Sequence, residues 1–249
     1  MTRRFAIYAA VGVAVYLAAL VVTLPATWIG RAIAEASGGR LTLRSTQGSV
    51  WAGSGHLIAR SREDALLDLG RLRWAAAPGR LVTGKLAVDV FLDERPGTRL
   101  EIAPGAVTLQ GLDLEFPARL LGGLAPGLET FGPEGSVRIR SESLRIDDQS
   151  ILGRADIEWR SIRLSRAHGL ELGSHVARLR GGGSKVDIEL GTLEGPLRVS
   201  GGGSWTREKG LAISGSAEPD AGASGALAPF LRSVCSEYRD GKCGFSVAR

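Results

Sequence analysis

A stretch near the N-terminus, from Phe5 to Leu24, contains no charged residue and constrains the rest of the chain more than any other feature. At a rise of about 1.5 Å per residue, a helix of this length matches a hydrocarbon core about 30 Å thick. A helix also satisfies its own backbone hydrogen bonds, which lipid cannot do for it. We therefore predict one membrane-spanning helix over residues 5–24, followed by an aromatic residue at the interface. The anchor residues of this prediction are Phe5, Leu17, Leu20, Leu24 and Trp28.

The charges around this stretch predict its orientation. Arg3 and Arg4 precede it, and basic residues favour the cytoplasmic side, so we expect residues 1–4 in the cytoplasm and residues 25–249 across the membrane. A cleaved signal peptide is the alternative, because it also begins with basic residues and an apolar core. That core is usually about 7–15 residues long, which is shorter than this stretch, and Pro25 disfavours cleavage. A retained anchor is therefore the favoured interpretation.

Most of the chain after residue 40 alternates between apolar and polar residues, which is the period of a half-buried strand. Leu86, Val88, Val90 and Leu92 form one such run, and the 35 glycines suit short strands joined by turns. At Gly70 the apolar residues change parity, which predicts a bulge. We expect a mainly β fold, with one large curved antiparallel sheet that forms a partly open barrel or groove and carries short helices.

The C-terminal part of the sequence returns to helical spacing. Between Leu227 and Tyr238, apolar residues recur on one face of an amphipathic helix, which Asp240 and Gly241 are expected to end. Residues 245–247 then predict a last strand.

The two cysteines of the chain, Cys235 and Cys243, lie in this same region. In an exported domain a nearby pair is expected to oxidise to a disulfide that closes a small loop. Two independent thiols are the alternative.

Charge and motif patterns argue against several functions. The net charge of +5 comes from interleaved basic and acidic residues without a basic block, which argues against nucleic-acid binding. Residues 79–85 resemble the start of a phosphate-binding loop, but Leu86 stands where that loop requires Ser or Thr. His56, His168 and His175 are scattered, and we expect them at surface or turn positions. We therefore predict no catalytic residue, no metal ligand, no cofactor and no enzymatic activity.

Several short motifs follow one another over nearly the whole chain. The most specific is Gly48-Ser-Val-Trp-Ala-Gly53, in which a tryptophan lies between two glycines at a strand end. The signature residues are Gly48, Trp51, Gly53, Trp74, Pro78, Gly84 and Gly241. In these features the chain resembles protein N of the bacterial type II secretion system. The cysteine pair departs from that pattern.

The resemblance implies a single-pass inner-membrane protein with a cytoplasmic N-terminus and a periplasmic β-rich domain over residues 25–249. It also implies an accessory role in the export of folded proteins, without catalysis or a cofactor. Two mechanisms agree with the alternation of apolar and polar residues. In the first, the domain docks other secretion-system proteins, through exposed strand edges or a curved face. In the alternative, an anchored module of the AsmA-like type holds a lipid in an apolar groove.

Overall fold

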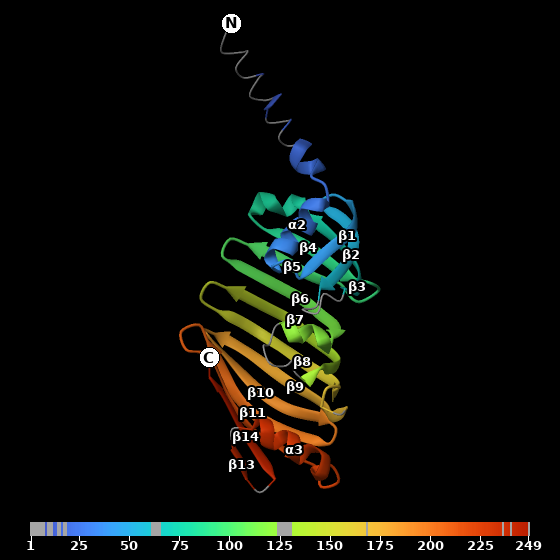
Figure 1. Ribbon diagram of the computed structural model, residues 1–249. Coiled ribbons are helices and arrows are strands. Elements are labelled where there is room, and N and C mark those ends of the chain that lie inside the picture. Colours follow the sequence, from blue (N-terminus) through green and yellow to red (C-terminus); the bar gives the residue numbers. More distant parts are fainter. Residues whose placement is uncertain are drawn as a thin grey trace. The chain divides into compact units, whose positions relative to one another are not determined.

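The computed structural model describes residues 8, 12–13, 16, 19–60, 66–123, 131–167, 169–235, 237–239 and 241–248. The chain divides into two compact units, Met1–Arg95 and Pro96–Arg249. Both consist mainly of antiparallel strands, which confirms the predicted mainly β class (Figure 1).

Much of the predicted anchor, including Phe5 and Leu17, lies outside the described residues. The last part of it, residues 19–23, is helical, and the Thr23 hydroxyl donates to the Ala19 carbonyl oxygen at 2.8 Å. Among the residues that can be described, no helix is both long enough and apolar enough to cross a membrane.

The described residues of the first unit continue with one helix and the first four strands of a 14-stranded antiparallel sheet, which confirms the prediction of one large antiparallel sheet. These four strands are neighbours in chain order, and the buried apolar residues of the unit include Ala26, Ala59, Trp74 and Ala87. The elements are α2 (Thr27–Ala36), β1 (Leu41–Gly48), β2 (Ala52–Arg60), β3 (Leu66–Ala77), the 3-10 helix η1 (Pro78–Thr83) and β4 (Leu86–Leu92).

The bulge predicted at Gly70 is confirmed. The register between β2 and β3 shifts between Leu57 and Ile58, which pair with Gly70 and Asp68. Gly70 has a φ of +107°, and the carboxylate of Asp93 occupies the space that a Cβ would need. A side chain at this position would therefore disturb both the backbone and the Asp93 contact to the Arg71 amide.

The described residues of the second unit form ten strands. These strands are neighbours in chain order until the end of the chain, as Figure 1 shows. There the last strand, β14, lies between β12 and the short β13. The elements are β5 (Thr98–Ala103), β6 (Ala106–Pro117), η2 (Ala118–Gly123), β7 (Pro133–Asp147), β8 (Ile151–Leu164), β9 (Leu170–Gly183), β10 (Lys185–Glu194), β11 (Leu197–Thr206), β12 (Gly210–Pro219), α3 (Ser224–Val234), β13 (Glu237–Arg239) and β14 (Lys242–Ala248).

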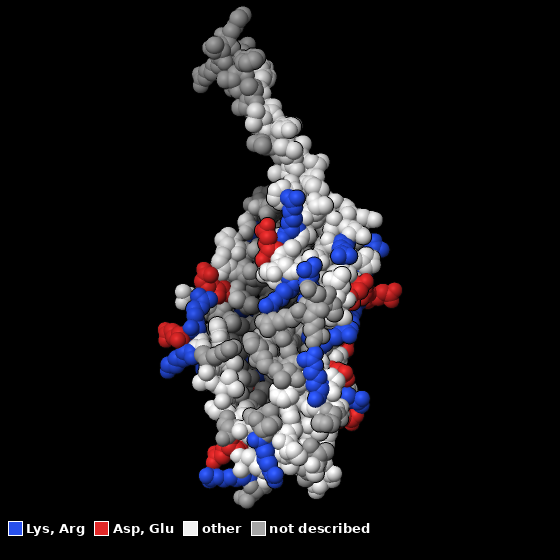
Figure 2. Space-filling model, in the orientation of Figure 1, with Lys and Arg blue, Asp and Glu red and all other residues white. Residues whose placement is uncertain are grey.

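Cross-strand pairing gives the strands of the second unit a charged face and an apolar face. On the charged face, Arg138 Nη2 lies 2.6 Å from Asp113 Oδ2, and the pair joins β7 to β6. On the apolar face, Ile139 of β7 pairs with Ile157 of β8. Figure 2 shows basic and acidic side chains interspersed over the visible surface, without a large patch of one sign. Alternation of side chains along each strand explains both faces.

The C-terminal helix differs from its prediction. α3 ends at Val234, Cys235 is extended, and Tyr238 belongs to β13 instead of the helix. The turn at Gly241 brings residues 237–239 back to pair with β14, and these backbone bonds outweigh continuation of the helical spacing. The predicted last strand at residues 245–247 is confirmed as part of β14.

Candidate functional site

Four of the signature residues meet in the first unit, around the hairpin between β1 and β2. Gly48, Trp51 and Gly53 belong to the hairpin, and Trp74 of β3 pairs with Gly53. The chain that leaves the N-terminal helical residues also reaches this hairpin. We call the whole group the N-terminal junction, and it comprises Val21, Leu24–Ala26, Gly48–Gly53 and Trp74.

Backbone hydrogen bonds join the entering chain to the hairpin. Pro25 forms an isolated antiparallel bridge with Ser49. The Ala26 amide donates to the Gly48 carbonyl at 3.1 Å, and the Val50 amide donates to the Leu24 carbonyl at 2.9 Å. Ala26 is only 3% exposed. These bonds attach residues 24–26 to the hairpin through a single β-bridge beside the end of β1.

The two glycines of the hairpin are required by close packing. Gly48 has a φ of +92°, and a Cβ on it would overlap the Ala52 carbonyl oxygen. A Cβ on Gly53 would lie 2.5 Å from Cζ2 of Trp74. A larger residue at either position would therefore displace the turn or the tryptophan.

Each tryptophan of the junction donates a hydrogen bond to a backbone carbonyl. Trp74 is 6% exposed, and its Nε1 donates to the Ser49 carbonyl at 3.1 Å. Trp51 Nε1 donates to the Val21 carbonyl at 2.9 Å. The last carbonyls of a helix have no partner within the helix, so the Trp51 indole satisfies one that would otherwise need water.

The other predicted anchor and signature residues lie apart from these contacts. Leu20 is exposed, Leu24 is half-buried, and Trp28 on α2 is 54% exposed, with the Arg31 guanidinium 6.0 Å from its ring centroid. Pro78 begins η1, and Gly84, with a φ of +71°, lies between η1 and β4. Gly241 belongs to the second unit, in the turn between β13 and β14.

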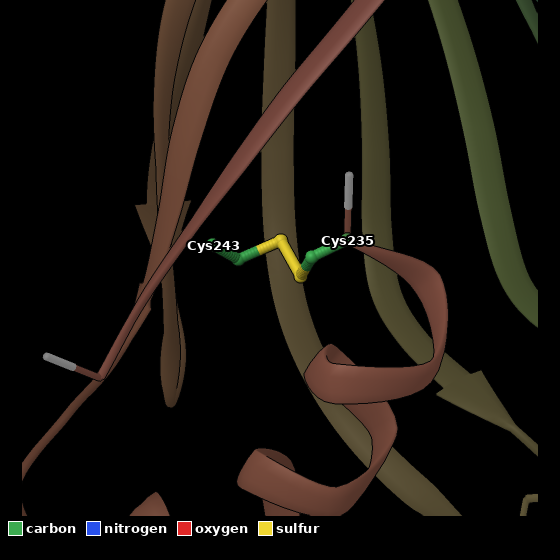
Figure 3. The surroundings of a disulfide bond; sticks show 2 residues. All are labelled: Cys235 and Cys243. Atoms are coloured by element: carbon green, nitrogen blue, oxygen red, sulfur yellow. A yellow bond between two sulfur atoms is a disulfide. The ribbon is translucent and has the colours of Figure 1, made fainter. Parts of the chain in front are cut away.

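A disulfide joins Cys235 and Cys243 in the second unit, at the end of α3 (Figure 3). Their Cα atoms are 5.5 Å apart, and Cys243 is 4% exposed. The bond connects the helix to β14 beside a buried apolar cluster. This cluster consists of Leu197, Ala217, Leu227, Leu231 and Cys243.

The histidines of the described chain do not form a metal site. No group of three or more His, Cys, Asp or Glu residues that could hold a metal ion occurs among the residues described. His56 lies on the surface, with Nδ1 3.8 Å from the Asp68 carboxylate, and His168 is outside the described residues.

The prediction of a surface or turn position is wrong for His175. It lies within β9, half-buried, with Nδ1 3.2 Å from the Thr192 hydroxyl. Its Nε2 is buried without a hydrogen-bond partner, and this burial lowers the pKa of the imidazole below its ordinary value. The side chain alternates onto the apolar face with Trp159, its partner on β8, which explains the burial.

A shallow cleft on the second unit, with a volume of about 710 Å³, lies over the middle of β6, β7 and β8. Its charged residues are Asp113, Arg140, Glu142, Arg154 and Asp156. Arg140 lies near two carboxylates, with Nε 3.9 Å from Asp113 Oδ1 and Nη1 3.6 Å from Glu158 Oε1. These contacts are cross-strand ion pairs of the kind that stabilises a sheet.

Sequence reasoning pointed to the tryptophans and glycines of the junction but missed their partners. The acceptors are main-chain oxygens of Val21 and Ser49, and the segment that bridges to the hairpin is Leu24–Ala26. A backbone carbonyl leaves no signal in the residue type that carries it. Only the proline after an apolar run, which prevents the helix from continuing, indicates where the bridging segment begins.

Comparison with known proteins identifies the family. The family model described as type II secretion system, protein N matches residues 39–246, a range that includes the hairpin of the junction and the Cys235–Cys243 disulfide. Neither the curated proteins nor the solved structures compared with the chain gave a significant match. Because the family model covers most of its length, the chain belongs to the protein N family of the type II secretion system.

Proposed function

We propose that the chain is an inner-membrane accessory of the type II secretion system whose β-rich units dock other components of the machine. Membership of the protein N family is the observation that carries this function. The described strands form one 14-stranded antiparallel sheet, which offers the broad faces and strand edges that such docking needs. The proposal assigns no chemical step to any residue.

The proposed topology rests on the N-terminal sequence. Residues 5–24 are uncharged and span the inner membrane, Arg3 and Arg4 stay in the cytoplasm, and residues 25–249 are periplasmic. The N-terminal junction supports this arrangement, because the bonds to Val21 and Leu24 connect the end of the proposed anchor directly to the β1–β2 hairpin. The β units are then held near the membrane surface, where confinement raises the local concentration of other anchored components.

Membrane fractionation and protease accessibility test the topology. An epitope inserted at the exposed turn of residues 207–209 avoids both chain ends. The intact chain should remain in the membrane after alkaline extraction, and protease should remove the epitope only after the outer membrane is opened. A chain that is recovered as a soluble periplasmic protein lacking its first 24 residues would overturn the anchored topology.

A secretion assay tests the function itself. Deletion of the chain should leave proteins that depend on the type II system in the periplasm, and the intact chain should restore their release. Cross-linking in cells should recover other inner-membrane or periplasmic components of the system. Normal secretion in the deletion strain, together with a phospholipid bound in equimolar amount to the purified chain, would instead favour the lipid-binding alternative.

A further inference from the structure

We propose that the outer edge of β14, at Ser246–Ala248, is a docking site for an extended, uncharged segment of another secretion-system protein, which adds a strand to the sheet. This inference rests on the proposed function, because it names the surface and the mode of docking. Three features carry it, namely the direction of the backbone groups, the absence of protective residues on this stretch, and the shortness of β13.

The hairpin register determines which backbone groups of β14 point outward. Arg239 pairs with Lys242 across a two-residue turn, and residues that flank such a turn form a mutual hydrogen-bonded pair. Hydrogen-bonded pairs then recur at every second residue, so Gly244 also bonds toward β13. By the same alternation, Val247 bonds toward Ile213 of β12, and Ser246 and Ala248 direct their N–H and C=O groups away from the sheet.

β13 covers only the first part of β14. It contains three residues, Glu237–Arg239, which pair with Lys242–Gly244. Before it the chain turns into α3, and the Cys235–Cys243 disulfide fixes Cys235 beside the sheet. A partner segment at Ser246–Ala248 would therefore continue the line of β13 and extend pairing that β14 already makes.

Among the residues that the structure describes, the part of β14 beyond its pairing with β13 lacks the devices that usually protect an edge strand. Residues 243–248 contain no charged residue and no proline, and the three residues from Ser246 onward are exposed. Val247 is 48% exposed, although it lies on the apolar side of the sheet with Ile213. Natural edges are normally protected by charge, proline, a bulge or a covering element.

The exposed backbone groups and side chains of Ser246–Ala248 define the chemistry of the partner. Ser246 and Ala248 offer backbone donors and acceptors, so the partner must supply an extended backbone without proline at the paired positions. Val247 favours an apolar, β-branched residue opposite it, and an uncharged edge favours an uncharged strand because a charge there would be desolvated. Three residues are too few for a stable dimer of two such edges, so we assign the site to a larger partner.

Photo-cross-linking in cells that contain the secretion machine tests the proposal. A benzoylphenylalanine at Val247 should form an adduct with another component of the machine, identified by mass spectrometry. The double variant Ser246→Pro, Ala248→Pro removes both outward N–H groups but none of the bonds to β12. It should lower the adduct at least about tenfold, with little change in thermal stability.

Two comparisons distinguish loss of the docking site from unfolding caused by the proline substitutions. Val247→Pro removes an inward N–H and should lower stability, which the double variant should not do. Ser246→Lys adds a charge at the edge, and Ser200→Lys is its matched control on the exposed side of β11, next to Ser216. Only the lysine at position 246 should reduce the adduct.

The outcomes separate this inference from the proposed function. An adduct with a secretion component that the edge variants remove supports the docking site. An adduct with a second copy of the chain, or one that Ser246→Pro, Ala248→Pro leaves unchanged, overturns it. If the probe at Val247 forms no adduct while probes placed at Trp28 or Ser200 cross-link to the machine, the docking site is overturned but the proposed function still stands. If no probe position forms an adduct and secretion is normal in the deletion strain, both the docking site and the proposed function are contradicted.

Discussion

The chain covers the strand end at the N-terminal junction but leaves part of the edge of the C-terminal strand β14 exposed. At the junction, residues 24–26 pair with the hairpin, α2 follows directly, and a register shift between Arg44 and Gln47 interrupts β1. At β14, the covering strand is three residues long, and Ser246–Ala248 remain exposed. A closed edge suits a fixed connection to an anchor, and an open edge suits a reversible contact with another protein.

The largest expected effect comes from breaking the closed region at Trp74. We expect Trp74→Ala to reduce the free energy of unfolding of the first unit by about 3–5 kcal/mol, because it leaves a cavity against Gly53 and removes the bond to Ser49. Urea unfolding of the detergent-solubilised chain, with amide exchange read in β2 and β3, measures this loss. Trp28→Ala is the matched control and should change stability by less than about 0.5 kcal/mol, since Trp28 is exposed.

Removing the Cys235–Cys243 disulfide should lower the stability of the region that carries the exposed edge of β14. We expect Cys235→Ala with Cys243→Ala to reduce stability by about 2–3 kcal/mol, because the bond closes a short loop and ties α3 to β14. Amide exchange should accelerate in α3 and β14 and stay unchanged in the junction. If amide exchange accelerated equally in α3 and β14 and in the N-terminal junction, the stabilities of these two regions would be coupled. That result would contradict the independence of the two regions.

The Trp51 indole provides a smaller and sharper test of the junction. Trp51→Phe keeps an aromatic ring but removes the donor to the Val21 carbonyl, and should cost about 1 kcal/mol. Faster amide exchange at Val50 and Ala26, with an unchanged β14, is the expected readout. Unaltered exchange at both amides would mean that the indole bond does not hold the entering chain.

Acidification should destabilise the second unit mildly through His175. Burial lowers the pKa of His175 in the folded chain, so near pH 6.5 the unfolded chain binds more protons than the folded one. Stability should therefore fall as the pH drops below about 6.5, until the folded imidazole also becomes protonated. Thermal unfolding between pH 5 and pH 8 measures this slope.

The His175→Gln variant is the control for that slope, and it should flatten the curve in this range. Asp147 does not interfere, because the hydroxyl of Ser150 holds the pKa of its carboxyl below the ordinary value of 3.8. Its contribution is lost only at more acidic pH. A slope that His175→Gln leaves unchanged would assign the effect to another group.

The sequence alone predicted the local features of the fold better than its long-range pairing. Alternation identified the strands, and the change of parity at Gly70 located a bulge. The same reasoning extended the last helix to Tyr238, because a three-residue strand after a helix is too short to change the apolar period. The insertion of β14 between β12 and β13 could not be read from the residues, since it depends on which edge the returning chain reaches.

At the candidate sites, too, the sequence predicted the side chains better than the backbone contacts. Gly48, Trp51, Gly53 and Trp74 were identified together, but their connection to the preceding helical residues runs through main-chain carbonyls of Val21 and Leu24. The open edge at Ser246–Ala248 depends on backbone direction, which the hairpin register sets and the side chains do not reveal.

Residue-resolved amide hydrogen exchange on the intact chain tests the contrast between the two edges most directly. We predict slow exchange at Ala26 and Val50 in the junction, where both amides are bonded. Along β14 we predict alternation, with slow exchange at Val247 and fast exchange at Ser246 and Ala248. Protection of Ser246 and Ala248 equal to that of Val247, in the absence of any partner, would contradict an open edge.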